Sequence, residues 1–398
     1  MPAPLSRAVV VGGGITGVTA CLELRRRGWA VTLVDVGPPP RPLATSSDAS
    51  RIVRMDYGGD RFLAELAREA LVGWERWNRE VFSRPLYHQT GFLLVSREPM
   101  APGGFEHDSL TTLLAMGEPA ERLTPEALHQ RFPAWAGGPW VDGYLSHRAG
   151  WAEAAEVVLQ LAERARQEGV EVVDGRVLAL SERGGRVQGV RLEGGGTLEA
   201  DAVVLATGAW TPALLPEMAA HLAARAMPVL YVRPRSPESF RPPGFPVWAA
   251  DIARTGWYGF PATADGLVKL GHHGPGWDGD PEHPGPLPGI WEPRGRAFLR
   301  QGLPALADAP LARSKVCFYA DTRDGDFWIA RHPGREGLVV AAGGSGHGFK
   351  FGPGLGRLVA GAVEGDDDAR LERFRWRPEA GARKEDARAG GAGLEGLD

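Results

Sequence analysis

Three glycines near the N-terminus, Gly12, Gly14 and Gly17, have the G-x-G-x-x-G spacing that can bind the pyrophosphate of a dinucleotide. A run of β-branched residues precedes them, and a helical pattern and a second strand follow, so the motif lies in a complete βαβ unit. Gly12 permits a tight turn, Gly14 lets the backbone approach the phosphates at the helix N-terminus, and Gly17 lets helix and strand pack closely. Asp35 ends the second strand and can accept hydrogen bonds from a ribose 2′-hydroxyl. The unit predicts a dinucleotide site and leaves NAD and FAD both open.

Other groups able to do chemistry stand at unusual places, and each also has an ordinary structural interpretation. Cys317 alone would be a small buried hydrophobe. Lys269 lies within an apolar strand, where an unpaired ammonium is costly, unless the strand is at an edge and the side chain reaches water. Arg51 and Arg54 are three residues apart, which is typical of a solvated surface or a phosphate patch, and Lys350 lies in a glycine-rich segment that could be a plain turn.

The elements that must position these groups are buried strands separated by long insertions. The strands predicted at 8–12, 201–206 and 338–342 have continuous apolar runs, as expected in a parallel sheet covered on both faces. Because they come from distant parts of the chain, they predict an α/β fold with a discontinuous nucleotide-binding domain, and the material at about 57–150 and 216–312 forms a second domain. The other predicted elements are helices at 18–27, 61–81 and 152–168 and strands at 29–35, 170–173, 176–180 and 187–192.

The composition excludes several classes of protein. The 45 Lys and Arg residues against 49 Asp and Glu leave a net charge of −4, whereas a nucleic-acid binder needs a basic stripe. No apolar run approaches the roughly 20 residues that span a bilayer, and no signal sequence precedes the first strand, so we expect a cytoplasmic protein without a membrane partner. Cys21 and Cys317 are too few for a disulfide framework and lack metal-ligand spacing, so no metal site is expected. The Gly- and Pro-rich residues 271–295 predict an irregular surface excursion, and 379–398 a frayed polar tail.

Beyond the glycine motif, the sequence resembles the amine-oxidising flavoproteins of the monomeric sarcosine oxidase and N-methyltryptophan oxidase family, within the D-amino-acid-oxidase superfamily. The most distinctive segments are VCFYADTRDGDFWIARHP at 316–333 and AAGGSGHGFKFGPGLG at 341–356. Their order and spacing relative to the other matching segments make the resemblance specific. The other matching segments are 9–35, 46–58, 256–261 and 266–273.

The resemblance implies a Rossmann-like FAD-binding domain of the GR2 type and a second α+β substrate domain built on a large mixed sheet. In the family, the cysteine that Cys317 matches holds FAD through a thioether to the flavin 8-methyl carbon. The implied domains are 1–56, 151–215 and 313–380 for FAD, 57–150 and 216–312 for substrate, and 381–398 as a polar tail. The implied FAD-binding residues are Gly12, Gly14, Ile15, Thr16, Gly17, Asp35, Ser46, Arg51, Val177, Gly208, Cys317, Gly344, Gly346, His347, Gly348 and Lys350.

The resemblance also implies a substrate site. Arg54 and Lys350 match the two arms of a clamp on the substrate carboxylate, and a planar guanidinium suits that task because it can donate two parallel hydrogen bonds. Arg51 matches a residue against the flavin ring. Lys269 matches a lysine that activates O2, since a fixed positive charge favours electron transfer to oxygen. The residues that match the pocket wall are Tyr258, His273 and Tyr319.

Two departures from the family bear on substrate size. Ala249 stands where sarcosine-type enzymes have a bulky apolar residue, nine positions before Tyr258, and His272 stands where tyrosine is usual. A smaller side chain leaves room for a larger substrate. We therefore expect a preferred substrate other than sarcosine, and we expect His272 itself to lie on a surface loop.

The implied function is an FAD-dependent oxidase of a secondary or cyclic amino acid. The substrate is a small molecule with a carboxylate, its hydride passes to flavin N5 to give an imine, and O2 reoxidises the flavin with release of H2O2. The family resemblance implies a monomer. Alternatives are a biosynthetic oxidase that takes a cyclic imino acid towards an aromatic product, a flavin dehydrogenase with another electron acceptor, a nicotinamide-dependent reductase, or a non-catalytic nucleotide-binding module.

Overall fold

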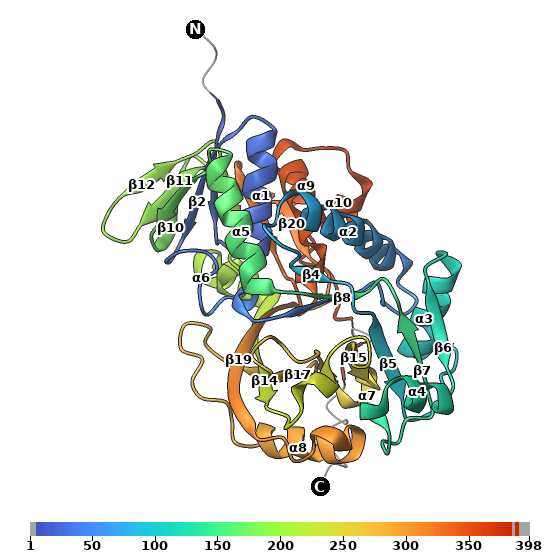
Figure 1. Cartoon of the computed structure of the whole chain (residues 1–398). Helices are drawn as coiled ribbons and strands as arrows, with labels where there is room; N and C mark the ends of the chain where they lie inside the picture. Colours follow the sequence, from blue (N-terminus) through green and yellow to red (C-terminus); the bar gives the residue numbers. More distant parts are fainter. Residues whose placement is uncertain (1–4, 384–386, 390–398) are drawn as a thin grey trace.

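The computed structural model describes residues 5–383 and 387–389 (Figure 1). Its first sheet has six strands in the order β20-β21-β13-β1-β2-β9. All neighbours in it are parallel except β20 and β21. The strands come from distant segments, which confirms that the predicted buried strands return to one sheet. They are β1 (Arg7–Val11), β2 (Ala30–Asp35), β9 (Glu171–Asp174), β13 (Ala202–Leu205), β20 (Trp328–Arg331) and β21 (Leu338–Ala342).

Helices cover one face of this sheet. Since alternate side chains of a strand point to opposite faces, every second strand residue packs against these helices. Val10 and Val204 face the cluster that contains α1 (Ile15–Arg26), α5 (Ala154–Gln167) and α9 (Gly352–Glu364). Helix α1 begins three residues earlier than predicted, since the glycine turn ends at its N-cap, Gly14.

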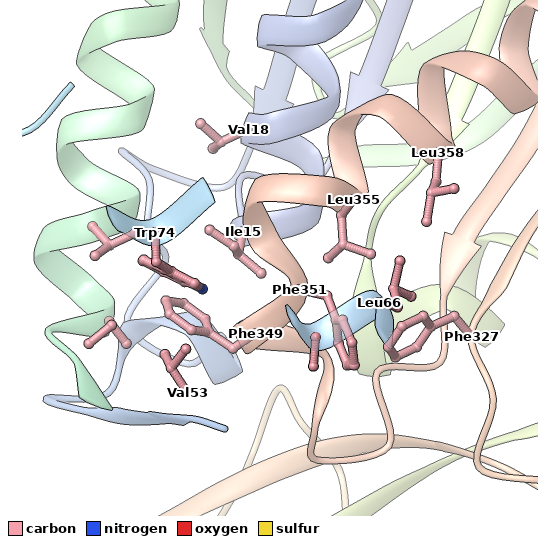
Figure 2. Packing of buried hydrophobic residues seen from close by; sticks show 14 of the residues in the cluster. Ile15, Val18, Val53, Leu66, Trp74, Phe327, Phe349, Phe351, Leu355 and Leu358 are labelled. Atoms are coloured by element: carbon pink, nitrogen blue, oxygen red, sulfur yellow. The ribbon is translucent and has the colours of Figure 1, made fainter. Parts of the chain in front are cut away.

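Helix α2 (Arg61–Glu80) matches the predicted 61–81 and packs through Trp74 against the segment that carries Phe349 (Figure 2). Its apolar stripe is buried, and Trp74 stacks on Phe349 with ring centres 5.8 Å apart. The Trp74 indole also donates a hydrogen bond to the Lys350 carbonyl at 2.7 Å. The helix thereby fixes the segment that carries Lys350.

The predicted strands at 176–180 and 187–192 do not join the parallel sheet. They form β10 (Val177–Arg183) and β11 (Arg186–Leu192), which with β12 (Thr197–Glu199) make a separate antiparallel sheet. The Gly184-Gly185 turn joins β10 directly to β11 as an antiparallel hairpin, whereas a parallel neighbour needs a long crossover. Residues of this small sheet pack against the parallel sheet in one apolar cluster.

The second large sheet is mixed, which confirms the expected fold class. Its order is β18-β14-β17-β16-β15-β5-β7-β6, with β19 also paired to β14, and β15 and β5 are its parallel pair. One face packs on an aromatic core that includes Trp135, Trp248, Trp257 and Phe298. The strands are β5 (Phe92–Ser96), β6 (Ala120–Leu123), β7 (Asp142–Ser146), β14 (Leu222–Val232), β15 (Val247–Ala250), β16 (Trp257–Gly259), β17 (Val268–His272), β18 (Trp277–Asp278) and β19 (Leu311–Thr322).

Three shorter strands and further helices complete the part of the chain that the structure describes. None of its helices has the length and hydropathy needed to span a bilayer. The three shorter strands form a further three-stranded sheet of β3 (Arg51–Val53), β8 (Gly150–Ala152) and β4 (Tyr87–His88). The remaining helices are α3 (Phe105–Ala115), α4 (Pro125–Arg131), α6 (Thr211–Leu214), α7 (Ile252–Thr255), α8 (Trp291–Gly302) and α10 (Ala369–Arg373).

Two predictions of irregular structure are wrong in part. The excursion predicted at 271–295 begins inside β17 and ends inside α8. The frayed tail is wrong for 387–389, where Ala387 and Ala389 are 3% and 4% exposed. Alanines flanked by charged residues in a Gly-rich stretch gave no apolar periodicity, so their burial had no sequence signal. Positions 384–386 and 390–398 of the predicted tail lie outside the described residues.

Candidate active site

A cleft of about 430 Å³ lies at the carboxyl ends of the parallel strands, where α/β sheets bind their ligands. The glycine motif, Asp35 and the segment after β21 meet there, although they are far apart in sequence. Four of the expected FAD-binding residues do not line this cleft: Gly17, Cys317, His347 and Lys350. Those that do are Gly12, Gly14, Ile15, Thr16, Asp35, Ser46, Arg51, Val177, Gly208, Gly344, Gly346 and Gly348.

The glycine turn fits a dinucleotide. Gly12 has φ +104°, and a Cβ on Gly17 would lie 1.8 Å from the Gly12 carbonyl oxygen, so packing requires both glycines. A Cβ on Gly14 would meet only the Ser46 hydroxyl, at 3.4 Å, so this backbone stays open to the cleft. Asp35 Oδ2 accepts a hydrogen bond from the Gly13 amide at 2.7 Å, and burial raises the pKa of Asp35. The turn is therefore held in shape from the protein side while its outer surface faces the ligand.

The substitutions Gly14→Ala and Gly17→Ala should separate ligand binding from folding. Gly14→Ala is expected to leave the unfolding midpoint of the apoprotein unchanged but to reduce FAD content at least about tenfold, because its methyl group occupies the phosphate approach. Gly17→Ala should destabilise the apoprotein itself, since its Cβ overlaps backbone. Thermal unfolding and flavin absorbance measure both effects. Equal FAD loss with equal destabilisation in the two variants would contradict the assignment.

A second, smaller cavity of about 60 Å³ opens from the cleft. The two share the lining residues Arg51, Tyr319, Gly346 and Phe349, so a ring bound in the cleft would border the small cavity. Five expected substrate residues, which lie on separate segments of the chain, line the small cavity together. They are Arg54, Tyr258, His273, Tyr319 and Lys350.

Arg54 is a buried cation directed at this cavity. It is 7% exposed, and its Nη1 has no hydrogen-bond partner among the described residues. Aromatic rings surround it, including Tyr57, whose ring centre is 5.2 Å from the guanidinium carbon, and Phe92 at 5.7 Å. Burial raises the pKa of neighbouring Asp56, although the charge of Arg54 opposes that shift. A buried donor without an acceptor is costly, so this nitrogen is suited to an anionic ligand.

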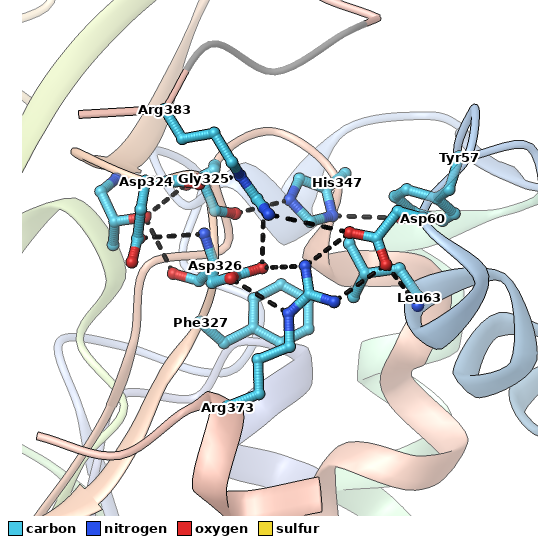
Figure 3. Close-up of polar contacts among 12 residues, drawn as sticks. Tyr57, Asp60, Leu63, Asp324, Gly325, Asp326, Phe327, His347, Arg373 and Arg383 are labelled. Carbon is cyan, nitrogen blue, oxygen red and sulfur yellow. Dashed lines mark hydrogen bonds and ion pairs between the residues drawn. The ribbon is translucent and has the colours of Figure 1, made fainter. Parts of the chain in front are cut away.

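Lys350 is held beside Arg54 by a short hydrogen-bond chain. Its Nζ donates to the Tyr57 hydroxyl at 2.9 Å and to the His347 carbonyl at 3.0 Å. The Tyr57 hydroxyl oxygen lies 3.1 Å from His347 Nδ1, and His347 Nε2 lies 2.9 Å from the Gly325 carbonyl oxygen (Figure 3). His347, which also lines the small cavity, therefore supports the lysine through its carbonyl and through Tyr57. Tyr57 was missed by sequence reasoning, because a tyrosine three residues after Arg54 also suits the core.

The turn that carries Gly325 is itself held by charge. Arg373 Nη2 lies 2.8 Å from Asp326 Oδ1 and 2.5 Å from Asp60 Oδ2, and Arg383 Nη2 lies 3.2 Å from the same Asp326 oxygen (Figure 3). The network ties the turn after β19 to the start of α2. It thereby links the segment that bears Tyr57 to the turn whose Gly325 carbonyl contacts His347.

Lys269 is fully buried, with 0% exposure, and lines neither cavity. Its Nζ donates to Asp48 Oδ2 and to the Ser50 carbonyl, both at 2.7 Å. Arg51 Nη1 shares the same Asp48 oxygen at 2.6 Å, and the Tyr231 hydroxyl donates to the other carboxylate oxygen. The Lys269 ammonium is thus connected through Asp48 to Arg51, one of the four residues that line both cavities at their junction.

The charged groups of Asp48, Lys269 and Arg51 shift the pKa values of their neighbours in this cluster. Burial alone would raise the pKa of Asp48, but Lys269 and Arg51 hold it well below its usual range. Burial lowers the pKa of Lys269 to about 8, although Asp48 works against the shift. Asp48 was missed in the sequence, where its only signal was the spacing D-x-x-R-x-x-R. It is the anion that fixes both cations.

Arg51 also connects the cleft to Cys317. Its Nη2 lies 3.1 Å from Cys317 Sγ, and the thiol is buried beside Tyr231. Cys317 therefore stands directly behind a residue of the cleft wall.

Two expectations about where residues lie, one for Ala249 and one for His272, are wrong. Ala249 pairs with Tyr258 across adjacent strands, but it is fully buried and does not line the small cavity, so its size does not enlarge that cavity. His272 is buried between Trp257 and Trp291, not on a surface loop, and burial lowers its pKa to about 3. The missed residues of the cavity wall are Ile52, Phe92, Ile252, Phe260 and Phe349, which read as ordinary core residues in the sequence.

Comparisons with known proteins agree with this architecture. L-saccharopine oxidase of Schizosaccharomyces pombe is 27% identical over 93% of this chain and 92% of its own. Monomeric sarcosine oxidase of a Bacillus species is 26% identical over 88% and 90%. The crystal structure of Amadoriase I, a fructosyl amine:oxygen oxidoreductase of Aspergillus fumigatus, superposes with a TM-score of 0.82 at 28% identity and covers 98% of this chain and 95% of its own. The resemblance to amine-oxidising flavoproteins is confirmed. Residues 7–362 match the family described as DAO, FAD dependent oxidoreductase, and the chain belongs to that family.

Proposed function

We propose that the protein is an FAD-dependent oxidase of a secondary or cyclic amino acid, with O2 as the electron acceptor and H2O2 as a product. The observation that carries the proposal is the pair Arg54 and Lys350, two buried cations on one small cavity that opens from the dinucleotide cleft. The named relatives act on amines that also bear a carboxylate or a sugar. This site favours the carboxylate, because its buried charges are positive.

The residues of the cavity bind and orient the substrate. Arg54 and Lys350 grip the carboxylate, and this contact places the amine near the junction at Arg51 and Tyr319. FAD, when bound, supplies the hydride acceptor and passes the electrons to O2. Aromatic walls exclude water from the amine, which reacts as the free base, and no carboxylate lines the small cavity as a general base within the described residues.

We propose that the division into FAD and substrate domains follows the two large sheets and that the protein works as a monomer.

We further propose that FAD is covalently attached through Cys317. Cys317→Ser should release the flavin into the supernatant on acid precipitation, whereas the wild-type pellet should stay yellow. The reason is that a serine hydroxyl is far less acidic than a thiol and does not add to the flavin methyl carbon. Cys21→Ser is the matched control, because this second cysteine is buried in α1, away from the cleft. Free flavin in acid-treated wild type would refute the attachment.

The function is tested by anaerobic reduction with a panel of N-alkyl and cyclic amino acids, followed by peroxide measurement in air. Bleaching of the flavin by a carboxylate-bearing amine, with one H2O2 per substrate, is the expected result. Two peroxides per substrate would favour the biosynthetic oxidase that forms an aromatic ring. Reduction by substrate with slow reoxidation in air would favour a dehydrogenase that uses another acceptor.

A further inference from the structure

The chain beyond α10 returns to the end of β19 and follows it towards the small cavity. Arg377 forms an ion pair with Asp324 at 2.6 Å, and the Arg383 amide donates to the Arg323 carbonyl at 3.0 Å. The next described segment, 387–389, lies still closer to the cavity.

Residues 387–389, which we name the C-terminal arm, contact two residues of the cavity wall. The Ala389 amide donates to the His273 carbonyl at 3.1 Å, and the Arg388 guanidinium carbon is 5.7 Å from the Tyr319 ring centre. The His273 and Tyr319 rings are 5.8 Å apart, and both line the small cavity. The arm therefore backs the wall that these two side chains form.

An ion pair between Arg388 and Asp321 helps to anchor the arm. Arg388 donates through Nη1 and Nη2 to the two oxygens of Asp321, the second at 2.9 Å, and Nη2 also lies 3.3 Å from the Ser345 carbonyl. The Asp321 and Arg388 side chains are only 9% and 19% exposed. A paired, largely buried guanidinium and carboxylate are held far more firmly than a surface pair. Asp321 lies two residues after Tyr319 on β19, so the pair joins the arm directly to the cavity wall.

We propose that the C-terminal arm is a specificity element that fixes His273 and Tyr319 and thereby limits the bulk of the amine substituent that the cavity accepts. The inference rests on the proposed function, in which the carboxylate lies at Arg54 and Lys350 and the substituent extends to the remaining walls. Asp321 and Arg388 act as positioning residues, since neither lines the cavity.

The holoenzyme variants Asp321→Asn and Arg388→Gln test the proposal with N-methyl and N-hexyl derivatives of one amino acid. Both variants should lower the kcat/KM preference for the small derivative about tenfold, since loss of one well-packed wall contact costs about that much discrimination. The double variant should lose less than the sum of the two single effects, because Asp321 and Arg388 share one ion pair, although Arg388→Gln also removes the bond to the Ser345 carbonyl. Arg84→Gln, which breaks a more exposed ion pair with Glu153, should leave the ratio unchanged. An unchanged ratio in both pair variants would overturn the proposal.

Two readouts that need no turnover separate this proposal from the proposed function. The first is the flavin absorbance change on binding short and long alkylthioacetates, whose affinity ratio should shift in the same variants. The second is tryptic cleavage after Arg388, which should accelerate in Asp321→Asn because the anchored side chain is released. If no amine reduces the flavin but both readouts respond, the oxidase proposal fails and the arm stands. If cleavage and affinity ratios match wild type, the arm has no such role.

Discussion

Replacing Lys269 by methionine is expected to slow the reaction of the reduced enzyme with O2 by about 100- to 1000-fold, the usual effect of removing one fixed charge from a preorganised site. The ammonium lies behind the junction of the two cavities, held by Asp48 and Ser50 in surroundings with no exposure to water. In such surroundings its charge is poorly screened and favours negative charge on oxygen. Stopped-flow mixing of the anaerobically reduced protein with oxygenated buffer measures the rate. The rate of flavin reduction by substrate should change far less.

The same reaction should depend on pH in a defined direction. Because burial lowers the pKa of Lys269 to about 8, the side chain is charged below that pH and neutral above it. The oxidation rate should therefore fall as the pH rises through about 8, and Lys269→Met should abolish this dependence.

Two further variants identify the charge as the cause. Lys315→Met is the control for a general loss of charge, since Lys315 belongs to β19, bonds Ser47 at 3.2 Å and acts on Asp48 through its charge alone. It should retain the wild-type rate. Asp48→Asn removes the anion that opposes the low pKa of Lys269, so its pH profile should move to lower pH. If Lys269→Met reacted with O2 as fast as wild type, the lysine would have no part in this step.

Much of the fold was predictable because its signals are local. The glycine turn, the apolar strands and the stripe of α2 each follow from backbone geometry or from residue spacing, and the observed elements agree within a few residues. The strands predicted at 176–180 and 187–192 are present, but their apolar pattern did not show that they pair with each other as a hairpin outside the parallel sheet. Pairing partners depend on contacts between distant segments, which periodicity does not encode.

The site was predictable in its cations and not in the groups that hold them. Arg54 and Lys350 were identified by motif, whereas Tyr57 and Asp48 become meaningful only after segments almost 300 and more than 200 residues apart meet. Ala249 shows the converse error. Its alignment with a bulky residue of the family, nine positions before Tyr258, suggested that it faces the cavity. The structure buries Ala249 in the core, and it does not line the small cavity.

Removing the carboxylate clamp should weaken substrate binding without loss of flavin. Arg54→Met or Lys350→Met is expected to raise KM about 10- to 100-fold, since a hydrogen bond to a charged group contributes about 1.5–3 kcal/mol. The double variant should lose about 1000-fold in kcat/KM. Flavin absorbance at saturating FAD and steady-state kinetics with the best amine of the panel provide the measurement. Arg97→Met is the matched control, because Arg97 also lies over an aromatic ring, Trp140 at 5.5 Å, but outside both cavities.

The methyl ester of the same amine shows whether the clamp reads charge. Wild type should prefer the free acid strongly, and the clamp variants should treat acid and ester nearly alike, because the lost cations no longer distinguish a carboxylate from a neutral group. Arg54→Lys should recover part of the preference, since it restores the charge but not the two parallel hydrogen bonds. If both methionine variants lost flavin and kept the acid-over-ester preference in the remaining holoenzyme, Arg54 and Lys350 would belong to the cofactor site and the carboxylate would bind elsewhere.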